Sequence, residues 1–301
     1  MAVPNAAIGT GASSLVRPAK RGRGMTATRR LQRALAICTM SFGAIFFLLP
    51  LFWMVMSSVK TSSEVFAYPP KWFPASIQWG NYATAFEQMH FLTLLKNSAL
   101  ITSMAMLGAL ISSSMAAYAF ARLRFAGRDL WFMVVLATMM LPGYVTMIPV
   151  YVIFRLLGWI NTLKPLIIPS FLGGGAFYIF LLRQYLMTIP YDLDDAARMD
   201  GCSHYRIYWN ILMPLARPAL GAAAIFLFIG HWNDFFGPLI YLHSQENFTL
   251  ALGLYRFRGP YTVEWNYLMA GTLMVAAAPL IIFFVFQRYF IEGMVMSGMK
   301  G

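Results

Sequence analysis

The fold is decided by residues 97–121, which read NSALITSMAMLGALISSSMAAYAFA and contain no Asp, Glu, Lys or Arg. A helix of roughly 20 apolar residues is long enough to cross a hydrocarbon core about 30 Å thick. Inside lipid, only helices and closed barrels satisfy all of their backbone polar groups. This run is too long for a barrel strand and lacks the alternation of one. It therefore predicts a membrane-spanning helix.

Five further apolar runs extend this prediction along the chain. They cover residues 34–59, 130–154, 165–182, 218–241 and 265–287. The fifth in chain order is interrupted by Asp234, and the fourth ends at Arg183, whose long side chain can reach the headgroups. We therefore expect an all-α membrane protein with six transmembrane helices.

The composition excludes several other classes of protein. Hydrophobic residues make up 59% of the 301 residues and charged residues 11%, whereas a soluble domain has about 45–50% and about 25%. An ordinary soluble globule and a disordered chain are excluded. Two cysteines, Cys38 and Cys202, are too few for a zinc ribbon, an iron–sulfur cluster or a disulfide framework.

The positive charge predicts the orientation in the membrane. Six spans place both termini on one side, and sixteen of the 23 Lys and Arg residues fall on that side. Since basic residues are enriched in cytoplasmic loops, we expect both termini and the loop of residues 190–218 to be cytoplasmic. The net charge of +12 is explained by this topology. Because the basic N-terminal segment has no aromatic residue, nucleic acid is not an expected partner.

Three parts of the chain are expected. Residues 1–33 form a flexible basic cytoplasmic arm, residues 34–290 form the transmembrane domain with the 190–218 loop inside it, and residues 291–301 form a cytoplasmic tail.

Motifs of catalysis and metal binding are missing. The sequence has no P-loop, no His-Glu-x-x-His and no Cys-x-x-Cys. Gly173, Gly174 and Gly175 fall inside the fourth run, where we expect them to permit close packing of helices. A membrane enzyme would need several ionisable groups at one depth, and only Asp234 lies well within a run. The chain is therefore not expected to be an enzyme or to hold a metal or cofactor.

The 190–218 loop carries the most informative pattern. Its first part reads as a short helix that Asp192 caps, with Asp195 three residues on, as in a capping box. Asp194 and Arg198 stand at i,i+4, the spacing of a helical ion pair.

The second part of this loop predicts a turn and another helix. Ala197 and Gly201 leave one side of the first helix almost without side chains, so that side could enter a cleft of another protein. Gly201 permits a turn, and Ser203 can cap the next helix. A membrane-surface amphipathic helix is a weaker interpretation, because the charges are mixed and the bare side is small rather than apolar.

This loop resembles the Glu-Ala-Ala loop of ABC-importer permeases. The family pattern E-A-A-x3-G-x9-I-x-L-P aligns with Asp195, Ala196, Ala197, Gly201, Ile211, Met213 and Pro214. Asp195 stands in place of Glu and Met213 in place of Leu, and both changes keep the charge or the apolar character.

Three further segments resemble the maltose-type sugar permeases, in the same order along the chain. They are Phe73-Pro74 with Trp79-Gly80-Asn81-Tyr82, then Trp232-Asn233-Asp234-Phe235 with Pro238-Leu239, and then Gln287-Arg288-Tyr289-Phe290 with Gly293 and Gly298-Met299-Lys300-Gly301. The chain length and six spans fit the smaller of the two permease partners.

The resemblance implies the type I ABC importer permease fold in a bacterial or archaeal plasma membrane. It implies a second permease subunit, two cytoplasmic ATPase subunits that bind ATP and Mg, and an extracytoplasmic sugar-binding protein that meets the loop of residues 243–264. The residues implied at the ATPase interface are Asp194, Asp195, Ala196, Ala197, Arg198, Gly201, Ile211 and Pro214 in the loop, with Gly298, Met299, Lys300 and Gly301 in the tail.

The function expected is a permease subunit that couples ATP hydrolysis by its partners to import of a di- or oligosaccharide or related sugar. A stand-alone channel or a secondary transporter is the alternative. Trp232, Asn233 and Asp234 are candidates for the translocation pathway, with a structural role between helices equally open. In some relatives only the partner permease holds the sugar, so this chain need not contain a substrate site.

Overall fold

The computed structural model describes residues 24–259 and 261–298, and these residues form helices joined by short connections. Over these two ranges there is no strand, only an isolated bridge between Arg258 and Val263. The chain divides into two units, residues 1–52 and 53–301. Helix α1 (Gly24–Ser58), most of which belongs to the first unit, starts before the expected 34–59 run and contains Pro50. Residues 1–23 of the expected arm lie outside the described part.

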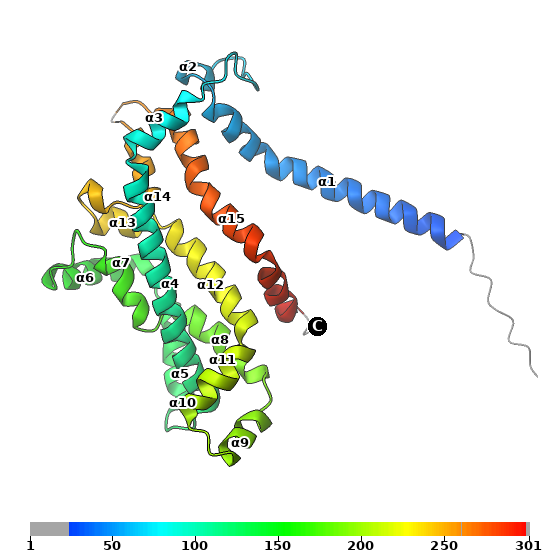
Figure 1. Ribbon diagram of the computed structural model, residues 1–301, viewed down its shortest axis with the longest axis vertical. Helices are drawn as coiled ribbons and strands as arrows, with labels where there is room; N and C mark the ends of the chain where they lie inside the picture. The colour runs from blue at the N-terminus through cyan, green and yellow to red at the C-terminus, as the bar shows by residue number, and fades with distance from the viewer. Residues whose placement is uncertain (1–23, 260, 299–301) are drawn as a thin grey trace, which may run out of the picture. The chain divides into compact units, whose positions relative to one another are not determined.

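Helix α4 (Phe91–Arg122) is the central element of the second unit. It packs along α8 (Ala176–Thr188) and α12 (Arg217–Trp232), and α12 in turn packs on α15 (Trp265–Gly298). Figure 1 shows α4 running from α3 (Gly80–Gln88) at one end to α9 (Asp192–Met199) at the other. Buried small residues on α4, including Ala105, Ser113 and Ala117, let the neighbouring helices approach closely.

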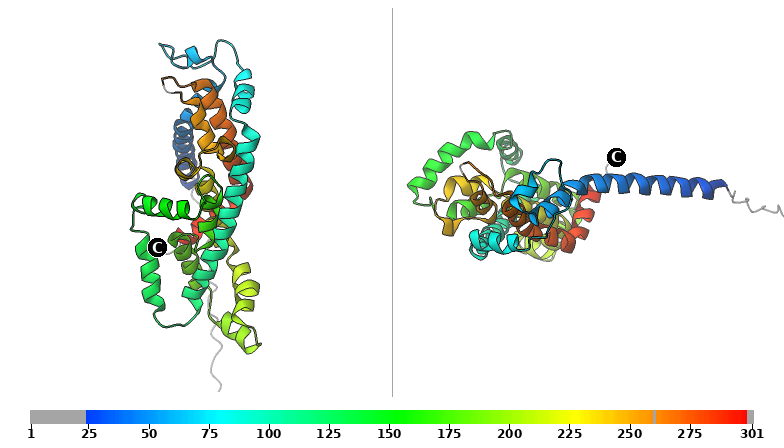
Figure 2. Two further views of the ribbon diagram at one scale, coloured as in Figure 1. Left: turned by 90° about the vertical axis from the view of Figure 1, so that its left-hand side faces the viewer. Right: turned by 90° about the horizontal axis from the view of Figure 1, so that it is seen from above.

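The sequence predicts one straight helix for the third apolar run, and the structure shows that this prediction is wrong. It is divided into α5 (Arg128–Thr138) and α6 (Gly143–Leu156), which meet at an angle of 96°. Pro142 precedes α6 and disfavours helical backbone at Leu141, which explains the break. The left view of Figure 2 shows α5 rising beside the bundle and α6 turning across it.

The fourth run is interrupted at its glycines. Its helical segments are α7 (Lys164–Ile167), the 3-10 helix η1 (Ile168–Phe171) and α8, with Gly173, Gly174 and Gly175 all at positive φ between η1 and α8. The glycines therefore lie at a break and not within a helix. The expected close packing is confirmed at Gly174, where a Cβ would lie 2.5 Å from the carbonyl oxygen of Ala109.

The fifth run is also shorter than expected. Helix α12 ends at Trp232, and a separate helix, α13 (Phe236–Tyr241), follows after three residues. Asp234 explains the restart, because its carboxylate accepts a hydrogen bond from the backbone N–H of Gly237 at 3.0 Å. The segment that leads into α12 bends from it by 78°.

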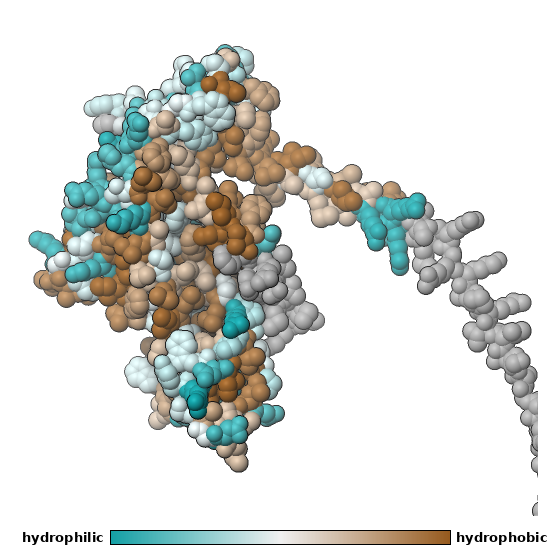
Figure 3. All heavy atoms as spheres, viewed as in Figure 1, coloured by the Kyte–Doolittle hydropathy of each residue, from teal (hydrophilic) through white to brown (hydrophobic). Residues whose placement is uncertain are grey.

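These elements still account for the expected membrane protein. Among the described residues, four helical segments are long and apolar enough to span a membrane, and the two bent pairs raise the number to six. Figure 3 shows apolar residues over the middle of the bundle, with hydrophilic residues along its upper left side and toward its lower end.

Short helices fill the two ends of the second unit. At the end near α3 they are α2 (Ser62–Val65), η3 (Gln245–Asn247), α14 (Leu250–Gly253) and η4 (Leu254–Phe257). At the end near α9 they are α10 (His204–Ile207), the π-helix η2 (Tyr208–Leu212) and α11 (Met213–Leu215). Each end has its own buried apolar cluster.

Candidate functional site

The 190–218 loop forms two helical arms joined by a turn, and Figure 1 shows α9 at the extreme end of the bundle. Gly201 makes the turn possible: its φ is +76°, a conformation that favours glycine. Cys202 N–H donates to the Ala197 carbonyl at 2.9 Å and closes the C-terminus of α9. The expected cap at Ser203 is confirmed, since its Oγ accepts from the Arg206 N–H at 3.4 Å.

The start of α9 differs from the expected capping box. Tyr191 occupies the cap position, and its carbonyl accepts from the N–H groups of Asp194 at 2.9 Å and Asp195 at 3.1 Å. Asp192 is the first helical residue and does not cap the helix. The three aspartates of the first turn still complement the positive end of the helix dipole.

The side of α9 that faces outward is not the one expected from spacing. Ala197 is buried, and it packs in an apolar cluster with residues of α4 and α8. Ala196 is exposed, and the larger apolar residues beside it are Leu193, which is 41% exposed, and Met199, which is 88% exposed. The outward surface therefore combines a small residue with two flexible apolar ones.

The second arm carries exposed aromatic residues of its own. Tyr205 and Trp209 are both exposed, with ring centroids 6.3 Å apart. Of the two remaining sequence-predicted residues of the loop, Ile211 packs partly against the buried cluster and Pro214 is exposed within α11.

The expected ion pair between Asp194 and Arg198 does not form. Arg198 instead pairs with Asp195 at 3.3 Å on the surface. Asp194 points inward and pairs with Arg122 at the end of α4, with Nη1 and Oδ2 separated by 3.1 Å. Helical spacing alone favoured the local partner, but Asp194 lies on the face of α9 that is packed against α4.

Arg122 is the residue of this site that the sequence pattern did not single out. Its side chain is fully buried, and its Nη2 donates to the carbonyls of Leu186 and Ile189, both at 2.7 Å. Its guanidinium carbon lies 4.2 Å from the ring centroid of Tyr191. The only feature of the sequence that marks Arg122 is its position directly after the apolar run of residues 97–121.

Burial dominates the electrostatics of Asp194. It raises the pKa of the Asp194 carboxyl above the ordinary value, while Arg122 and Arg198 act in the opposite direction. Within the described part of the chain, neither carboxylate oxygen accepts a well-aligned hydrogen bond. The pair with Arg122 is therefore a close charge contact that does not fully compensate the desolvation.

The candidate pathway residues lie at the end of α12 and in the break that follows it. Trp232 is buried, and its Nε1 donates to the Val275 carbonyl of α15 at 3.1 Å, which is a structural contact between helices. Asn233 is exposed and its side chain bonds to the Ile229 carbonyl at 3.0 Å. Asp234 lies in the break, and its Oδ1 accepts from the Gly237 N–H in the first turn of α13 at 3.0 Å.

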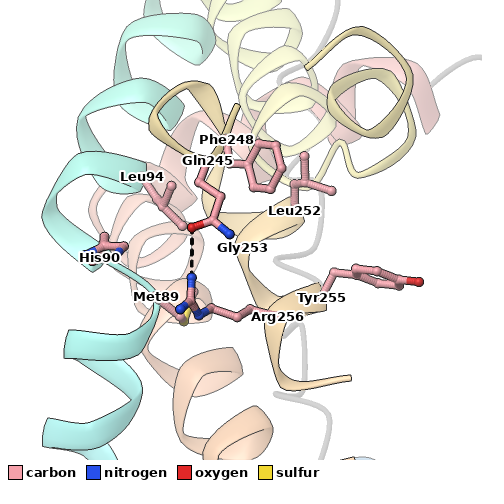
Figure 4. Close-up of a pocket in the computed structure, with 9 residues that line it drawn as sticks. All are labelled: Met89, His90, Leu94, Gln245, Phe248, Leu252, Gly253, Tyr255 and Arg256. Carbon is pink, nitrogen blue, oxygen red and sulfur yellow. Dashed lines mark hydrogen bonds between the residues drawn. The ribbon is translucent and has the colours of Figure 1, made fainter. Parts of the chain in front are cut away.

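The opposite end of the bundle contains the loop of residues 243–264. Asn161, at a φ of +59°, holds this loop: its Oδ1 accepts from the N–H groups of His243 at 3.0 Å and Ser244 at 2.8 Å. A cavity of about 170 Å³ lies beside the loop, and Figure 4 shows Arg256 donating to Gln245 across it. Sequence spacing gave no sign of the Asn161 contacts.

The tail residues expected at the ATPase interface lie almost wholly outside the described part of the chain. Met299, Lys300 and Gly301 of the tail are not described, and Gly298 is described only as the backbone end of α15. Within the described ranges, no three His, Cys, Asp or Glu residues gather as a metal site.

Comparisons with known proteins identify the family. Residues 108–295 match the family described as "Binding-protein-dependent transport system inner membrane component". The chain is 34% identical over 270 residues to the arabinooligosaccharides transport system permease protein AraQ of Halalkalibacterium halodurans, covering 88% of this chain and 96% of that protein. It is 30% identical over 272 residues to the lactose transport system permease protein LacG of Rhizobium radiobacter, covering 90% and 98%.

A solved structure agrees with these sequence comparisons. A chain in the crystal structure of a bacterial ABC transporter involved in the import of the acidic polysaccharide alginate matches with a TM-score of 0.74 and 25% identity. The match covers 87% of this chain and 98% of that chain. This helical, multi-pass chain therefore has the type I importer fold and belongs to the family of inner-membrane permeases of binding-protein-dependent ABC transport systems.

Proposed function

We propose that this chain is a permease subunit of an ATP-driven importer for a di- or oligosaccharide, with both termini and the 190–218 loop in the cytoplasm. Relatives named for arabinooligosaccharide and lactose transport support a carbohydrate substrate. The distribution of Lys and Arg supports the orientation, because the basic residues are concentrated on the side of that loop.

The observation that carries the proposal is the outward surface of the 190–218 loop. Leu193, Ala196 and Met199 on α9, together with Tyr205 and Trp209 on the second arm, are exposed at the end of the bundle. Exposed apolar side chains gathered on a protruding helix are typical of an interaction site. We assign this surface to a cleft of a cytoplasmic ATPase subunit, with α9 as the coupling helix.

Asp195 and Arg198 flank this apolar surface, and Gly201 sets the angle between its two arms. We therefore assign Asp195, Arg198 and Gly201 to the same interface with the ATPase subunit. The tail of Gly298, Met299, Lys300 and Gly301 is proposed to reach the ATPase as well, by the resemblance of its sequence to the family.

The remaining partners follow from the same assignment. A second permease subunit completes the pathway, and two ATPase subunits supply the sites for ATP and Mg. An extracytoplasmic binding protein delivers the sugar at the opposite end, where Asn161 orders the loop of residues 243–264. Asn233 and Asp234, at the break after α12, are the polar groups of this chain that we place along the pathway.

Reconstitution tests this function directly. The chain, its permease and ATPase partners and the binding protein are placed in liposomes, and uptake of labelled arabinotriose, lactose and maltose is measured with and without ATP. We expect ATP-dependent uptake of at least one sugar, and none with an ATPase subunit that cannot hydrolyse ATP. Uptake without ATPase subunits would instead show a stand-alone channel or secondary transporter. If ATP drives uptake of neither these sugars nor any other carbohydrate, the substrate assignment is wrong.

A further inference from the structure

Arg122 joins three helical elements at the cytoplasmic end proposed above. From the last turn of α4 its guanidinium bonds to the carbonyls of Leu186 and Ile189, at the end of α8, and pairs with Asp194 of α9. An arginine has five donors in a planar fork, so one side chain can fix several groups in one geometry. A lysine at this position would lack that fork.

Tyrosine hydroxyls also bind both arms of the loop to α4, that of Tyr191 at the start of α9 and that of Tyr118, on α4, at the start of α10. Tyr191 Oη donates to the Ala121 carbonyl at 2.7 Å, and Tyr118 Oη donates to the His204 carbonyl at 3.2 Å. One turn earlier, Ser114 Oγ and Tyr208 Oη lie 2.8 Å apart. The C-terminal half of α4 therefore bonds to both helical arms of the loop, and Arg122 makes the most buried of these contacts.

Stability alone does not explain an ion pair at this position. The Asp194 carboxyl is buried, and its pKa is raised because burial outweighs the attraction of Arg122. Buried ion pairs of this kind are often no more stabilising than apolar residues of similar size. What the pair does supply is orientation, because the guanidinium must satisfy α8 carbonyls and the α9 carboxylate at once.

We infer that Arg122 is a positioning residue that fixes the coupling helix α9 to the ends of α4 and α8, so that movement of α9 is transmitted to α4. The inference rests on the proposed function, since it assumes that an ATPase subunit moves α9. Without the Arg122 contacts, α9 can tilt on its own, and part of each ATPase movement is lost before it reaches the pathway. ATP hydrolysis then continues with less sugar imported per ATP.

The test compares variants in the assembled complex. Arg122→Lys keeps the charge but not the fork. The double variant Arg122→Met with Asp194→Leu removes both charges and so avoids an unpaired buried carboxylate. Arg124→Gln removes the exposed arginine two residues further along and is the matched control. Each is assayed for ATP hydrolysis, and for uptake of labelled arabinotriose or lactose, per amount of assembled complex.

We expect the double variant to melt within a few degrees of the wild type and to import at least five-fold less sugar per ATP. Arg122→Lys should show a smaller loss, and Arg124→Gln none. If the double variant imports as much sugar per ATP as the wild type, the inference is overturned. A double variant that no longer assembles would also overturn it, because the pair would then be needed for folding and not for transmission.

A distance measurement separates this inference from the identity of the sugar. Spin labels on cysteines at Arg124 and Asp200, with Cys38 and Cys202 replaced by serine, report how firmly α9 is held to α4. The wild type should give one narrow distance distribution, and the double variant a broader one. A lower import ratio without broadening would contradict positioning as the cause. Because this readout needs no transport, a failure of the proposed substrate does not affect it.

Discussion

Gly174 lies directly against the backbone of Ala109, so that a Cβ on Gly174 would come 2.5 Å from the Ala109 carbonyl oxygen. This contact lies between α4 and the break that precedes α8, and it lets the chain enter α8 close against α4. The φ of Gly174 is +63°, which also favours glycine. Glycine is needed here for two independent reasons.

Replacing Gly174 with alanine should therefore destabilise the protein by about 2–4 kcal/mol, from backbone strain and from the steric clash together. The measurement is the free energy of unfolding in detergent or nanodiscs. Gly158→Ala is the matched control, because Gly158 has a similar φ of +66° but no atom within 4 Å of its Cβ position. We expect about 1 kcal/mol for the control. Equal effects for both variants would show that the contact with Ala109 is unimportant.

Asn161 should govern the order of the loop that we assign to the binding protein. Asn161→Gly keeps the positive φ but removes the bonds to His243 N–H, Ser244 N–H and Ser244 Oγ. Since each of these three hydrogen bonds contributes about 1 kcal/mol, amide exchange at residues 243–247 should rise at least ten-fold when all three are lost. Asn161→Asp keeps the two acceptor contacts, so its increase should be smaller. Similar exchange in both variants would assign the order of the loop to its backbone alone.

The number of membrane segments could be predicted from the sequence because it depends on composition. Runs without charge mark lipid-embedded segments wherever they occur, and all six expected runs overlap helices of the structure. Their interruptions could not be predicted in the same way. Hydropathy records how apolar a segment is but not its direction, so the bend before Gly143 and the end of α12 at Trp232 were missed.

The candidate site was located by its motif, but its orientation was not. The spacing of Asp194 and Arg198 gives a local ion pair, and the sequence contains no information on which face of α9 packs inward. The structure turns Asp194 and Ala197 toward α4 and leaves Ala196 exposed. The partner of Asp194 is Arg122, which is distant in sequence and can be identified only once α4 and α9 are in place.

Asp194 should give the stability a distinct pH dependence. Because its pKa is raised in the folded protein, the folded state holds the proton more tightly than the unfolded state. Its contribution is then fully present below the ordinary carboxyl pKa of about 4 and is lost as pH rises through the folded pKa. Arg122, Arg198, Asp195 and His204 are the charged or titratable groups that act on it.

The measurement is the melting temperature between pH 4 and pH 7 for the wild type and for Asp194→Asn. The asparagine cannot titrate, so the melting temperature of the wild type minus that of the variant should fall as pH rises. A difference that increases with pH would mean that the attraction of Arg122 exceeds the cost of burial.

Met199 should matter for assembly and not for folding. Its side chain is 88% exposed on the outward surface of α9, so Met199→Asp removes no buried contact within this chain. We expect an unchanged melting temperature for the separate permease chain and at least a ten-fold weaker association with the ATPase subunits, because a charge would be buried in their cleft. Met199→Leu, which keeps the apolar character, should associate normally. Normal association of the aspartate variant would remove Met199 from the interface.

A comparison of Gly201 with Gly127 tests whether glycine at the turn is needed for folding or for docking. The φ of Gly201, +76°, is matched by that of Gly127, +75°, and neither has a close steric contact at its Cβ position. Leucine at either glycine should therefore strain the backbone by a similar amount, about 1–2 kcal/mol. Only Gly201→Leu places a bulky side chain beside the surface that we propose enters the ATPase. We expect it to lose ATP-dependent uptake or to fail to bind the ATPase, while Gly127→Leu retains both at a slightly lower melting temperature. Full uptake by Gly201→Leu would show that this side of the turn does not face the ATPase, and the coupling assignment would have to be abandoned.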